Sequence, residues 1–237
     1  MDISLVIPAF NERDNIPTLL DACRAELERY EGSHEIVLIE DGSSDGSAEL
    51  LAELAAREPL LRPIYHAAGE RIGCHPSELE GFKAARGDVL VFLPADLQIR
   101  PDVVPAFVSA CERADVVASH RVRRADAAWR RYLSAANNRV ERLLMGVDVH
   151  DAHSSMALTR RAVDVVVARI ASNSAVIPAE ILVRARRAGL RISEIEIEHY
   201  PRTAGRQTGA EPSEILKVQF DLLRLRRRLA REAGIGY

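Results

Sequence analysis

The chain has 237 residues, a formal net charge of −3, 47% hydrophobic residues and 28% charged residues. These values are typical of an ordinary globular protein and exclude collagen-like, disordered and disulfide-scaffold classes. The length suits one domain, because a single core stops growing at roughly 250–300 residues. No apolar run approaches the roughly 20 residues of a membrane-spanning helix, and the first residues lack the basic flank of a signal peptide, so we expect a cytoplasmic protein.

Charge is distributed unevenly along the chain. Residues 1–118 carry a net charge of −12 and residues 119–237 a net charge of +9. The basic second half predicts an anionic partner, either a phosphorylated small molecule or a membrane surface, and nucleic acid is not expected. Simple solvation of helices is the alternative explanation for many of these arginines. The three cysteines lie in dissimilar contexts and predict reduced thiols: Cys23, Cys74 and Cys111.

Short runs rich in Val, Ile and Leu alternate with helical patterns in the first half of the chain. The expected strands are 3–8, 35–39, 59–65, 88–93 and 115–119. Helices are expected to begin at residues 14–17, 45–47 and 77–78. This alternation predicts βαβ units, and therefore an α/β fold with a mostly parallel central sheet flanked by helices. Beyond Ser119 the pattern is looser, with a helix expected over 132–145 and a half-exposed strand over 192–199.

Polar residues gather at three of the expected strand ends. These segments are Pro8–Glu12, Glu40–Gly46 and Pro94–Gln98. In an open α/β sheet, ligands bind outside the carboxyl ends of the strands. Acids that cluster there repel each other unless a cation or hydrogen-bond donors neutralise them. A divalent metal bound together with a nucleotide diphosphate would do both.

Three segments in order, Val6–Glu12, Ile39–Gly46 and Gly87–Gln98, resemble family-2 glycosyltransferases of the GT-A fold. The similarity is to polyprenyl-phosphate sugar transferases of the dolichol-phosphate mannosyltransferase type, and extends from about Ile3 to Gly205. It implies a Rossmann-like GT-A domain. It also implies inverting transfer of a sugar from a GDP- or UDP-linked donor to a polyprenyl phosphate or a small hydroxylated acceptor, assisted by Mg²⁺ or Mn²⁺.

The same resemblance assigns roles to individual positions. Contacts to the nucleotide sugar are implied for Pro8, Ala9, Phe10, Glu12, Ile39, Asp41, Ala95, Arg202 and Arg206. Metal binding is implied for Asp96 and Gln98, since Mg²⁺ and Mn²⁺ prefer oxygen ligands and accept few protein groups when phosphates complete the shell. This chain has Pro94 where relatives usually have a first Asp. A turn starting at Asp41 and a cap at Asp96 are the purely structural alternatives.

Two further residues are candidates for catalysis alongside Asp96. Arg121 follows the fifth expected strand, where a guanidinium can bind phosphate oxygens bidentately. Asp151 lies between His150 and His153 and is the candidate general base if the acceptor is a hydroxyl. A polar surface turn is the alternative, and the spacing fits no compact zinc site.

The segment Pro201–Arg206 resembles a loop that closes over the diphosphate in the relatives. Relatives carry a lysine six residues after the first arginine, whereas this chain has Thr208, so Arg206 is expected to supply that charge. Glycines in this stretch suit a moving lid, and a static basic turn is the alternative.

We expect one domain over 1–210, with a nucleotide-binding half at 1–118 and an acceptor-side half at 119–210, followed by a basic amphipathic helix at 211–237. The apolar stripe of this helix comprises Ile215, Val218, Leu222, Leu225 and Leu229, widened by Leu216, Phe220 and Leu223. The basic face comprises Lys217, Arg224, Arg226, Arg227, Arg228 and Arg231. Residues 213–231 are expected to lie on anionic lipid at the inner membrane face, on the domain's own core, or on a second copy of the chain.

Two functional alternatives accompany the transferase interpretation. A nucleotide-sugar-binding pseudoenzyme is suggested by Pro94 and Thr208. Nucleotidyl transfer is the third possibility, but it calls for a glycine-rich phosphate loop after the first strand, and Pro8–Asn11 offers none.

Overall fold

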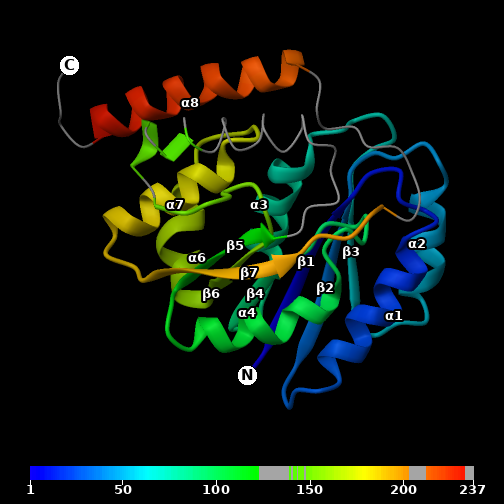
Figure 1. Cartoon of the computed structure of the whole chain (residues 1–237). Helices are drawn as coiled ribbons and strands as arrows, with labels where there is room; N and C mark the ends of the chain where they lie inside the picture. Colours follow the sequence, from blue (N-terminus) through cyan, green and yellow to red (C-terminus); the bar gives the residue numbers. More distant parts are fainter. Residues whose placement is uncertain (123–138, 140, 143, 147, 203–211, 233–237) are drawn as a thin grey trace.

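The computed structural model describes residues 1–122, 139, 141–142, 144–146, 148–202 and 212–232, with the backbone alone of 212–216. Its centre is a seven-stranded sheet in the order β3-β2-β1-β4-β6-β5-β7 (Figure 1). The strands are β1 (Ile3–Ala9), β2 (His34–Glu40), β3 (Leu61–Tyr65), β4 (Val89–Phe92), β5 (Val116–Val122), β6 (Met156–Thr159) and β7 (Ile192–Glu198). Every pairing is parallel except the two made by β6. The predicted mostly parallel sheet is confirmed.

Helices cover both faces of this sheet. They are α1 (Ile16–Leu27), α2 (Ser47–Ala55), α3 (Cys74–Ala84), α4 (Val104–Cys111), α6 (Arg160–Val166), α7 (Ile177–Arg187) and α8 (Pro212–Glu232), with 3₁₀ turns at Pro101–Val103 and Val167–Arg169. One core layer joins the sheet to α1, α2 and α4, and the other joins it to α3, α6, α7 and α8. Along β1, Leu5 and Ile7 enter the first layer and Val6 the second, because successive side chains of a strand point to opposite faces.

The six predicted strands are confirmed, with ends displaced by up to three residues. The start of α3 is a correction, because this helix begins at Cys74 and not at Ser77. Gly73 enters the helix with a φ of 104°, which glycine adopts without steric cost. Pro76 lies within the first turn, where the amide N–H groups lack intrahelical partners and proline is tolerated.

Strand β6 is a feature that the sequence did not predict. It spans four residues and pairs antiparallel with both β4 and β5. An apolar run this short carries too little periodicity to distinguish a strand from a buried helix segment. Because β6 runs antiparallel to β5, from the pair Met156–Ala118 toward Val116, the chain that precedes Met156 lies toward the carboxyl end of β5. The residues just before β6 are thereby brought to the same edge of the sheet as the ends of the parallel strands.

Helix α8 packs on the domain's own core. Leu222, Leu225 and Leu229 are at most 2% exposed and join the core layer that contains α7. The stripe is narrower than predicted, because Phe220 and Leu223 are 57% and 41% exposed. The side chains of Ile215 and Leu216 lie outside the described residues.

Polar contacts reinforce this packing. Arg228, predicted on the solvated basic face, donates from Nη2 to Glu180 at 2.7 Å and to Ser172 at 2.8 Å. Arg184 of α7 bridges Glu180 and Glu232. Glu180 is fully buried, and although burial alone would raise its pKa, hydrogen bonds from Ser172 and Arg184 lower it. Arg228 therefore lies at the boundary between α8 and the core and not on a fully solvated face, because the buried carboxylate of Glu180 needs a cationic partner.

All three cysteines are free thiols, as predicted. Within the described part of the chain, no helix combines the length and hydrophobicity needed to cross a bilayer.

Truncating Leu225 tests the packing of α8. We expect Leu225→Ala to lower the free energy of unfolding by about 2–4 kcal/mol, because it opens a cavity at a buried site. The matched control is Leu223→Ala on the exposed side of the same helix, expected to change stability by less than about 0.5 kcal/mol. Equal effects of the two substitutions in urea denaturation would contradict this packing.

Candidate active site

The candidate site lies where the sheet reverses its winding, between the carboxyl ends of β1 and β4 (Figure 1). Strand β2 lies on one side of β1 and β4 on the other, which makes their ends the crevice in which open α/β sheets bind ligands. The loops after these two strands contain the two described non-glycine residues with positive φ, Asn11 at 54° and Leu97 at 58°. Such a conformation costs a residue on the order of 1–3 kcal/mol and concentrates at functional sites.

One guanidinium links these two loops. Arg202 donates from Nη2 to Glu12 Oε1, and its Nη1 is 4.0 Å from Asp96 Oδ2. Glu12 is 8% exposed, and its second oxygen accepts a hydrogen bond of 2.6 Å from Asn15. The structure therefore brings together Glu12, Asp96 and Arg202, which lie far apart in the sequence.

Backbone pairing holds Arg202 in place. The segment after β7 is tied to the loop after β4, because Tyr200 N donates to Gln98 O at 2.9 Å. The side-chain amide of Gln98 donates to Tyr200 O at 3.4 Å. The arginine that follows is thereby delivered to the carboxyl edge of β4.

The charges and burial around Asp96 favour a further cation beside it. Burial raises the pKa of the Asp96 carboxyl, although the backbone hydrogen bond from Gln98 and the charge of Arg121 act in the opposite direction. Burial also lowers the pKa of the Arg202 guanidinium. Since burial disfavours the ionised form of an acid, a positive charge placed beside Asp96 would stabilise its carboxylate.

Asp96 and Gln98 fit a hard divalent cation as ligands. The Gln98 amide nitrogen is used toward Tyr200, which leaves its carbonyl oxygen available as an acceptor. Among the residues that the structure describes, no three His, Cys, Asp or Glu side chains are arranged to hold a metal. The protein would thus supply two oxygen ligands, which suits Mg²⁺ or Mn²⁺ when phosphates and waters complete the shell. The same finding gives no support to a zinc centre around Asp151.

The carboxylate of Asp41 is bound by other groups of the protein. Its carboxylate accepts hydrogen bonds from the backbone of Ile72 and Gly73, at 2.8 and 2.9 Å, and lies 2.9 Å from His66 Nδ1. Its side chain is 2% exposed. Arg71 lies 3.8 Å from Asp41, and its guanidinium carbon is 4.1 Å from the centre of the Phe10 ring. Asp41 therefore organises the loop that borders Phe10, and its contact with a nucleotide stays a prediction.

The other predicted nucleotide contacts lie at the strand ends. Pro8, Ala9, Ile39 and Ala95 are buried and so position the loops that follow them. Their roles as ligands stay predictions. Arg206 and Thr208 lie outside the described residues.

Arg121 and Asp151 form an ion pair that the sequence did not predict. Asp151 Oδ2 accepts from Arg121 Nε at 2.8 Å and lies 2.6 Å from Nη2. The Asp151 side chain is 3% exposed, and its other oxygen accepts from the backbone of His153 at 3.2 Å. The contact follows from β6, which places the residues before it beside the end of β5.

Two histidine–glutamate pairs next to this ion pair were also missed. His153 Nε2 lies 2.8 Å from Glu141 Oε2, and His75 Nδ1 lies 2.7 Å from Glu78 Oε2. The i, i+3 spacing of His75 and Glu78 could have indicated the second pair once α3 was placed correctly. The first joins segments 12 residues apart, and no local pattern signals it.

Comparison with solved structures defines the class of fold. Glucosyl-3-phosphoglycerate synthase from Mycobacterium tuberculosis, in complex with Mn²⁺, UDP-glucose and phosphoglyceric acid, matches with a TM-score of 0.70 at 18% identity, over 94% of this chain and 79% of that chain. Its complex with UDP matches with a TM-score of 0.69 at 19% identity, over the same shares. The fold is that of the GT-A glycosyltransferases.

Sequence comparison supplies the family. The profile of glycosyl transferase family 2 matches residues 4–166, and the chain belongs to this family. Undecaprenyl-phosphate 4-deoxy-4-formamido-L-arabinose transferase from Pseudomonas savastanoi pv. phaseolicola is 32% identical over 224 residues, and its counterpart from Pseudomonas fluorescens (strain Pf0-1) is 33% identical. Both alignments cover 93% of this chain, which spans 64% of the length of either relative.

The pH dependence of stability tests the contacts of His66 with Glu80 and Asp41. Burial alone would lower the pKa of His66, but Glu80 and Asp41 outweigh burial and raise it. A raised histidine pKa stabilises the folded state fully below the unfolded pKa of about 6.5, and this contribution is lost as pH rises through the folded pKa. We expect the melting temperature of the wild type to exceed that of His66→Gln most at pH 5.5, with the difference shrinking toward pH 9.

A Glu80→Gln background provides the control. The pH dependence of the wild-type versus His66→Gln difference should be smaller there, because the strongest interaction that raises the pKa of His66 is weakened. If the melting-temperature difference between the wild type and His66→Gln, with Glu80 intact, were constant across pH, these contacts of His66 would be contradicted.

Proposed function

We propose that this chain is an inverting glycosyltransferase that moves a sugar from a GDP- or UDP-linked donor to a polyprenyl phosphate. The observation that carries the proposal is the bridge from Arg202 to Glu12 and Asp96 at the switch point of the sheet. Acids and arginines that meet there suit a pyrophosphate, because the acids accept a cation and the arginines bind phosphate oxygens. Relatives named as undecaprenyl-phosphate sugar transferases, and the Mn²⁺ and UDP-glucose complex of the M. tuberculosis enzyme, support it.

The chemical task is to break the bond between the anomeric carbon and the diphosphate while negative charge builds on the leaving group. A divalent cation held by Asp96 and Gln98 would act as a Lewis acid toward the phosphate oxygens. Arg121 and Arg202, which contact Asp151 and Asp96 at this edge, would bind and orient the leaving group through fixed positive charge. Arg206 is proposed to add a further charge.

The state of Asp151 favours a phosphate over a hydroxyl as the acceptor. A hydroxyl needs a base, and Asp151 is the candidate. However, its carboxylate is buried, with Oδ2 bound by two nitrogens of Arg121 and Oδ1 by the backbone of His153, so both oxygens are already engaged within the protein. A phosphate is already ionised and needs no base. The small hydroxylated acceptor is the alternative that this ion pair disfavours.

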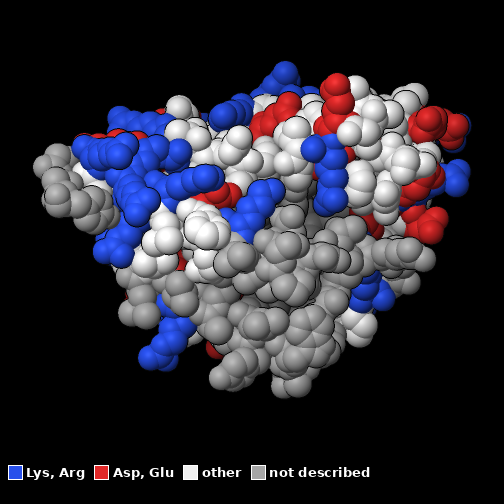
Figure 2. All heavy atoms as spheres, turned by 90° about the horizontal axis from the view of Figure 1, so that it is seen from above, with Lys and Arg blue, Asp and Glu red and all other residues white. Residues whose placement is uncertain are grey.

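We also propose that the outward face of α8 rests on anionic lipid, where a polyprenyl phosphate would be found, which places the protein at the inner face of the cytoplasmic membrane. The face opposite the buried leucines comprises the exposed residues Lys217, Phe220, Leu223, Arg224, Arg227 and Arg231. Figure 2, which looks onto this end of the molecule, shows Lys and Arg side chains gathered on the left, toward the carboxyl end of α8. Basic residues that flank exposed apolar ones suit an interfacial helix.

Removing the Asp96 carboxylate tests the catalytic proposal. We expect Asp96→Ala to lower kcat/KM for transfer, or for donor hydrolysis, by at least about 100-fold, consistent with loss of a charge-stabilising contact. EDTA should abolish turnover in the wild type. The control is Asp164→Ala, an exposed carboxylate on α6, which should retain full activity.

Turnover that survives both EDTA and Asp96→Ala would refute the metal assignment.

Pro94, in the place of a first acid, favours the pseudoenzyme as the second candidate function. Binding of a nucleotide sugar without hydrolysis or transfer to any acceptor would support that alternative.

Vesicle binding tests the membrane proposal. Since α8 belongs to the core, point substitutions on its outward face are more informative than truncation. We expect the double variant Phe220→Glu and Leu223→Glu to reduce co-sedimentation with phosphatidylglycerol vesicles at least tenfold. The double variant Arg57→Glu and Arg113→Glu, at exposed positions on the rest of the surface, should bind nearly as the wild type does.

Equal partition of the wild type and the α8 variant would overturn the membrane contact. Self-association without lipid, lost in the same variant by analytical ultracentrifugation, would instead identify a second copy of the chain as the occupant of this face.

A further inference from the structure

Two histidines lie side by side next to the proposed pyrophosphate site. The ring centres of His75 and His153 are 5.6 Å apart with an angle of 54° between their planes, and His75 lies 6.3 Å from the ring of Phe92. They come from the first turn of α3 and the segment before β6. Each is anchored at one ring nitrogen by a buried glutamate, with Glu78 fully buried and Glu141 6% exposed. This anchoring fixes the orientation of each ring.

Contacts connect this pair to the catalytic residues. The backbone of His153 donates to Asp151, which holds Arg121, and the charge of Arg121 acts in turn on Asp96. Phe92, beside His75, is the last residue of β4 and precedes Asp96 by four positions. The histidines are therefore adjacent to the place where a donor's pyrophosphate would lie. The group attached to that pyrophosphate is the sugar.

The charge balance distinguishes between possible ligands. Each histidine of the pair lies beside a carboxylate, His153 beside Glu141 and His75 beside Glu78. Glu141 raises the pKa of His153, although burial alone would lower it. The two carboxylates of this cluster would repel a phosphate, whereas their oxygens can accept hydrogen bonds from hydroxyl groups. The cluster therefore suits a neutral ligand rich in hydrogen-bonding groups.

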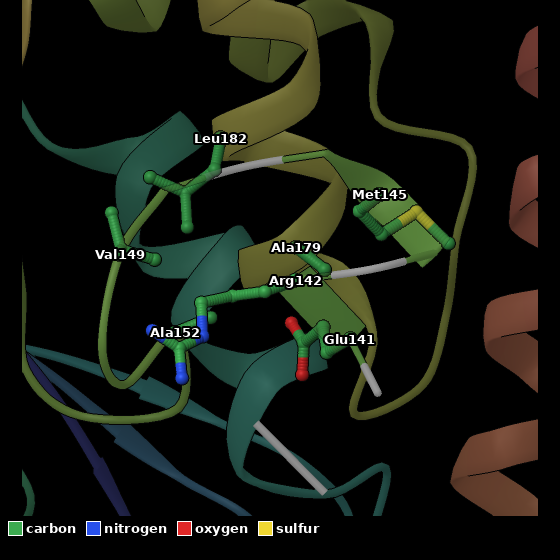
Figure 3. Close-up of a pocket in the computed structure, with 7 residues that line it drawn as sticks. All are labelled: Glu141, Arg142, Met145, Val149, Ala152, Ala179 and Leu182. Atoms are coloured by element: carbon green, nitrogen blue, oxygen red, sulfur yellow. The ribbon is translucent and has the colours of Figure 1, made fainter. Parts of the chain in front are cut away.

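The hydrogen-bonding capacity of the cluster is not exhausted. Oε1 of Glu78, Oε1 of Glu141 and Oγ of Ser155 are buried and have no partner among the described residues. Figure 3 shows the Glu141 side chain among residues that line a hollow with room for about one water molecule, bordered by Met145 and Leu182. Buried polar groups without protein partners are satisfied by water or by a ligand.

We propose that His75 and His153 form the subsite that recognises the sugar ring of the donor, with His75 Nε2 and His153 Nδ1 bonding sugar hydroxyls. The inference rests on the proposed function and names the residues that select its donor. The glutamates take the opposite nitrogens, His75 Nδ1 and His153 Nε2, and so determine which atom of each ring faces the ligand. Imidazole faces also offer a surface for the C–H groups of a sugar.

The two histidines allow substitutions that keep the glutamate contact and remove the ligand-facing nitrogen. His153→Gln places an amide near the position of Nε2 and loses Nδ1, whereas His75→Asn places one near Nδ1 and loses Nε2. The matched control is His150→Asn in the same segment, where the imidazole also contacts a glutamate but is 61% exposed. Melting temperatures confirm that each variant folds.

Calorimetry with Mn²⁺ present separates the sugar from the nucleotide. Each protein is titrated with GDP and UDP, and with the GDP- or UDP-linked sugar that binds the wild type most tightly. We expect His153→Gln and His75→Asn each to weaken nucleotide-sugar binding about tenfold and to leave nucleoside diphosphate binding within about twofold, as expected for loss of one hydrogen bond to the sugar. His150→Asn should match the wild type in both titrations.

Selectivity supplies a readout that a purely structural role would not change. The ratio of kcat/KM for two donors that differ only in the configuration of one sugar hydroxyl should shift in at least one of the two variants. Unchanged sugar affinity and an unchanged ratio in both variants, with a wild type that binds nucleoside diphosphates, would overturn the inference alone. A wild type that binds no nucleoside diphosphate would instead overturn the proposed function.

Discussion

The structure depends on one electrostatic constraint, which is that two acids at the switch point of the sheet, the buried Glu12 and the partly buried Asp96, require a cation between them. Glu12 follows β1 and Asp96 follows β4, and both are brought to the same crevice by parallel pairing of the two strands. Arg202, in the segment after β7, supplies the positive charge beside both carboxylates. Its guanidinium occupies a place in which a divalent ion and a pyrophosphate would meet the same carboxylates, so nucleotide binding requires these charges to rearrange.

The uneven distribution of charge along the sequence is explained by the candidate site. Glu12 and Asp96 come from the acidic first half, whereas Arg121 and Arg202 come from the basic second half. At the proposed sugar subsite, each histidine lies beside a glutamate. At the strand ends, burial raises the pKa of Asp96, so a cation beside it would stabilise its carboxylate. A site of this kind suits a metal-bound diphosphate next to a neutral sugar.

The sequence predicted six of the seven strands and the acidic residues at the edge of the sheet, because a buried strand followed by clustered acids is a local pattern. It also predicted α8 and the central apolar stripe that contains Leu225, but not that Phe220, which widens this stripe, is exposed. Only the position of α7 decides how much of the stripe is buried. The same holds for Arg228, whose partner Glu180 lies 48 residues away.

What could not be predicted depends on long-range geometry. The pairing of Arg121 with Asp151 requires β6, a four-residue strand without a distinguishing period. The left-handed turn at Leu97 has no glycine to signal it. The His153–Glu141 contact joins a loop to a helix, and its importance appears only beside the independent His75–Glu78 pair.

The most direct test of the central claim is a crystal structure with Mn²⁺ and a nucleoside diphosphate, measured at the manganese absorption edge. The account predicts an anomalous peak on the side chains of Asp96 and Gln98, with Arg202 withdrawn from at least one of its two carboxylates to contact the diphosphate. A bound nucleotide with no peak at this edge, and with Arg202 still bridging Glu12 and Asp96, would contradict it.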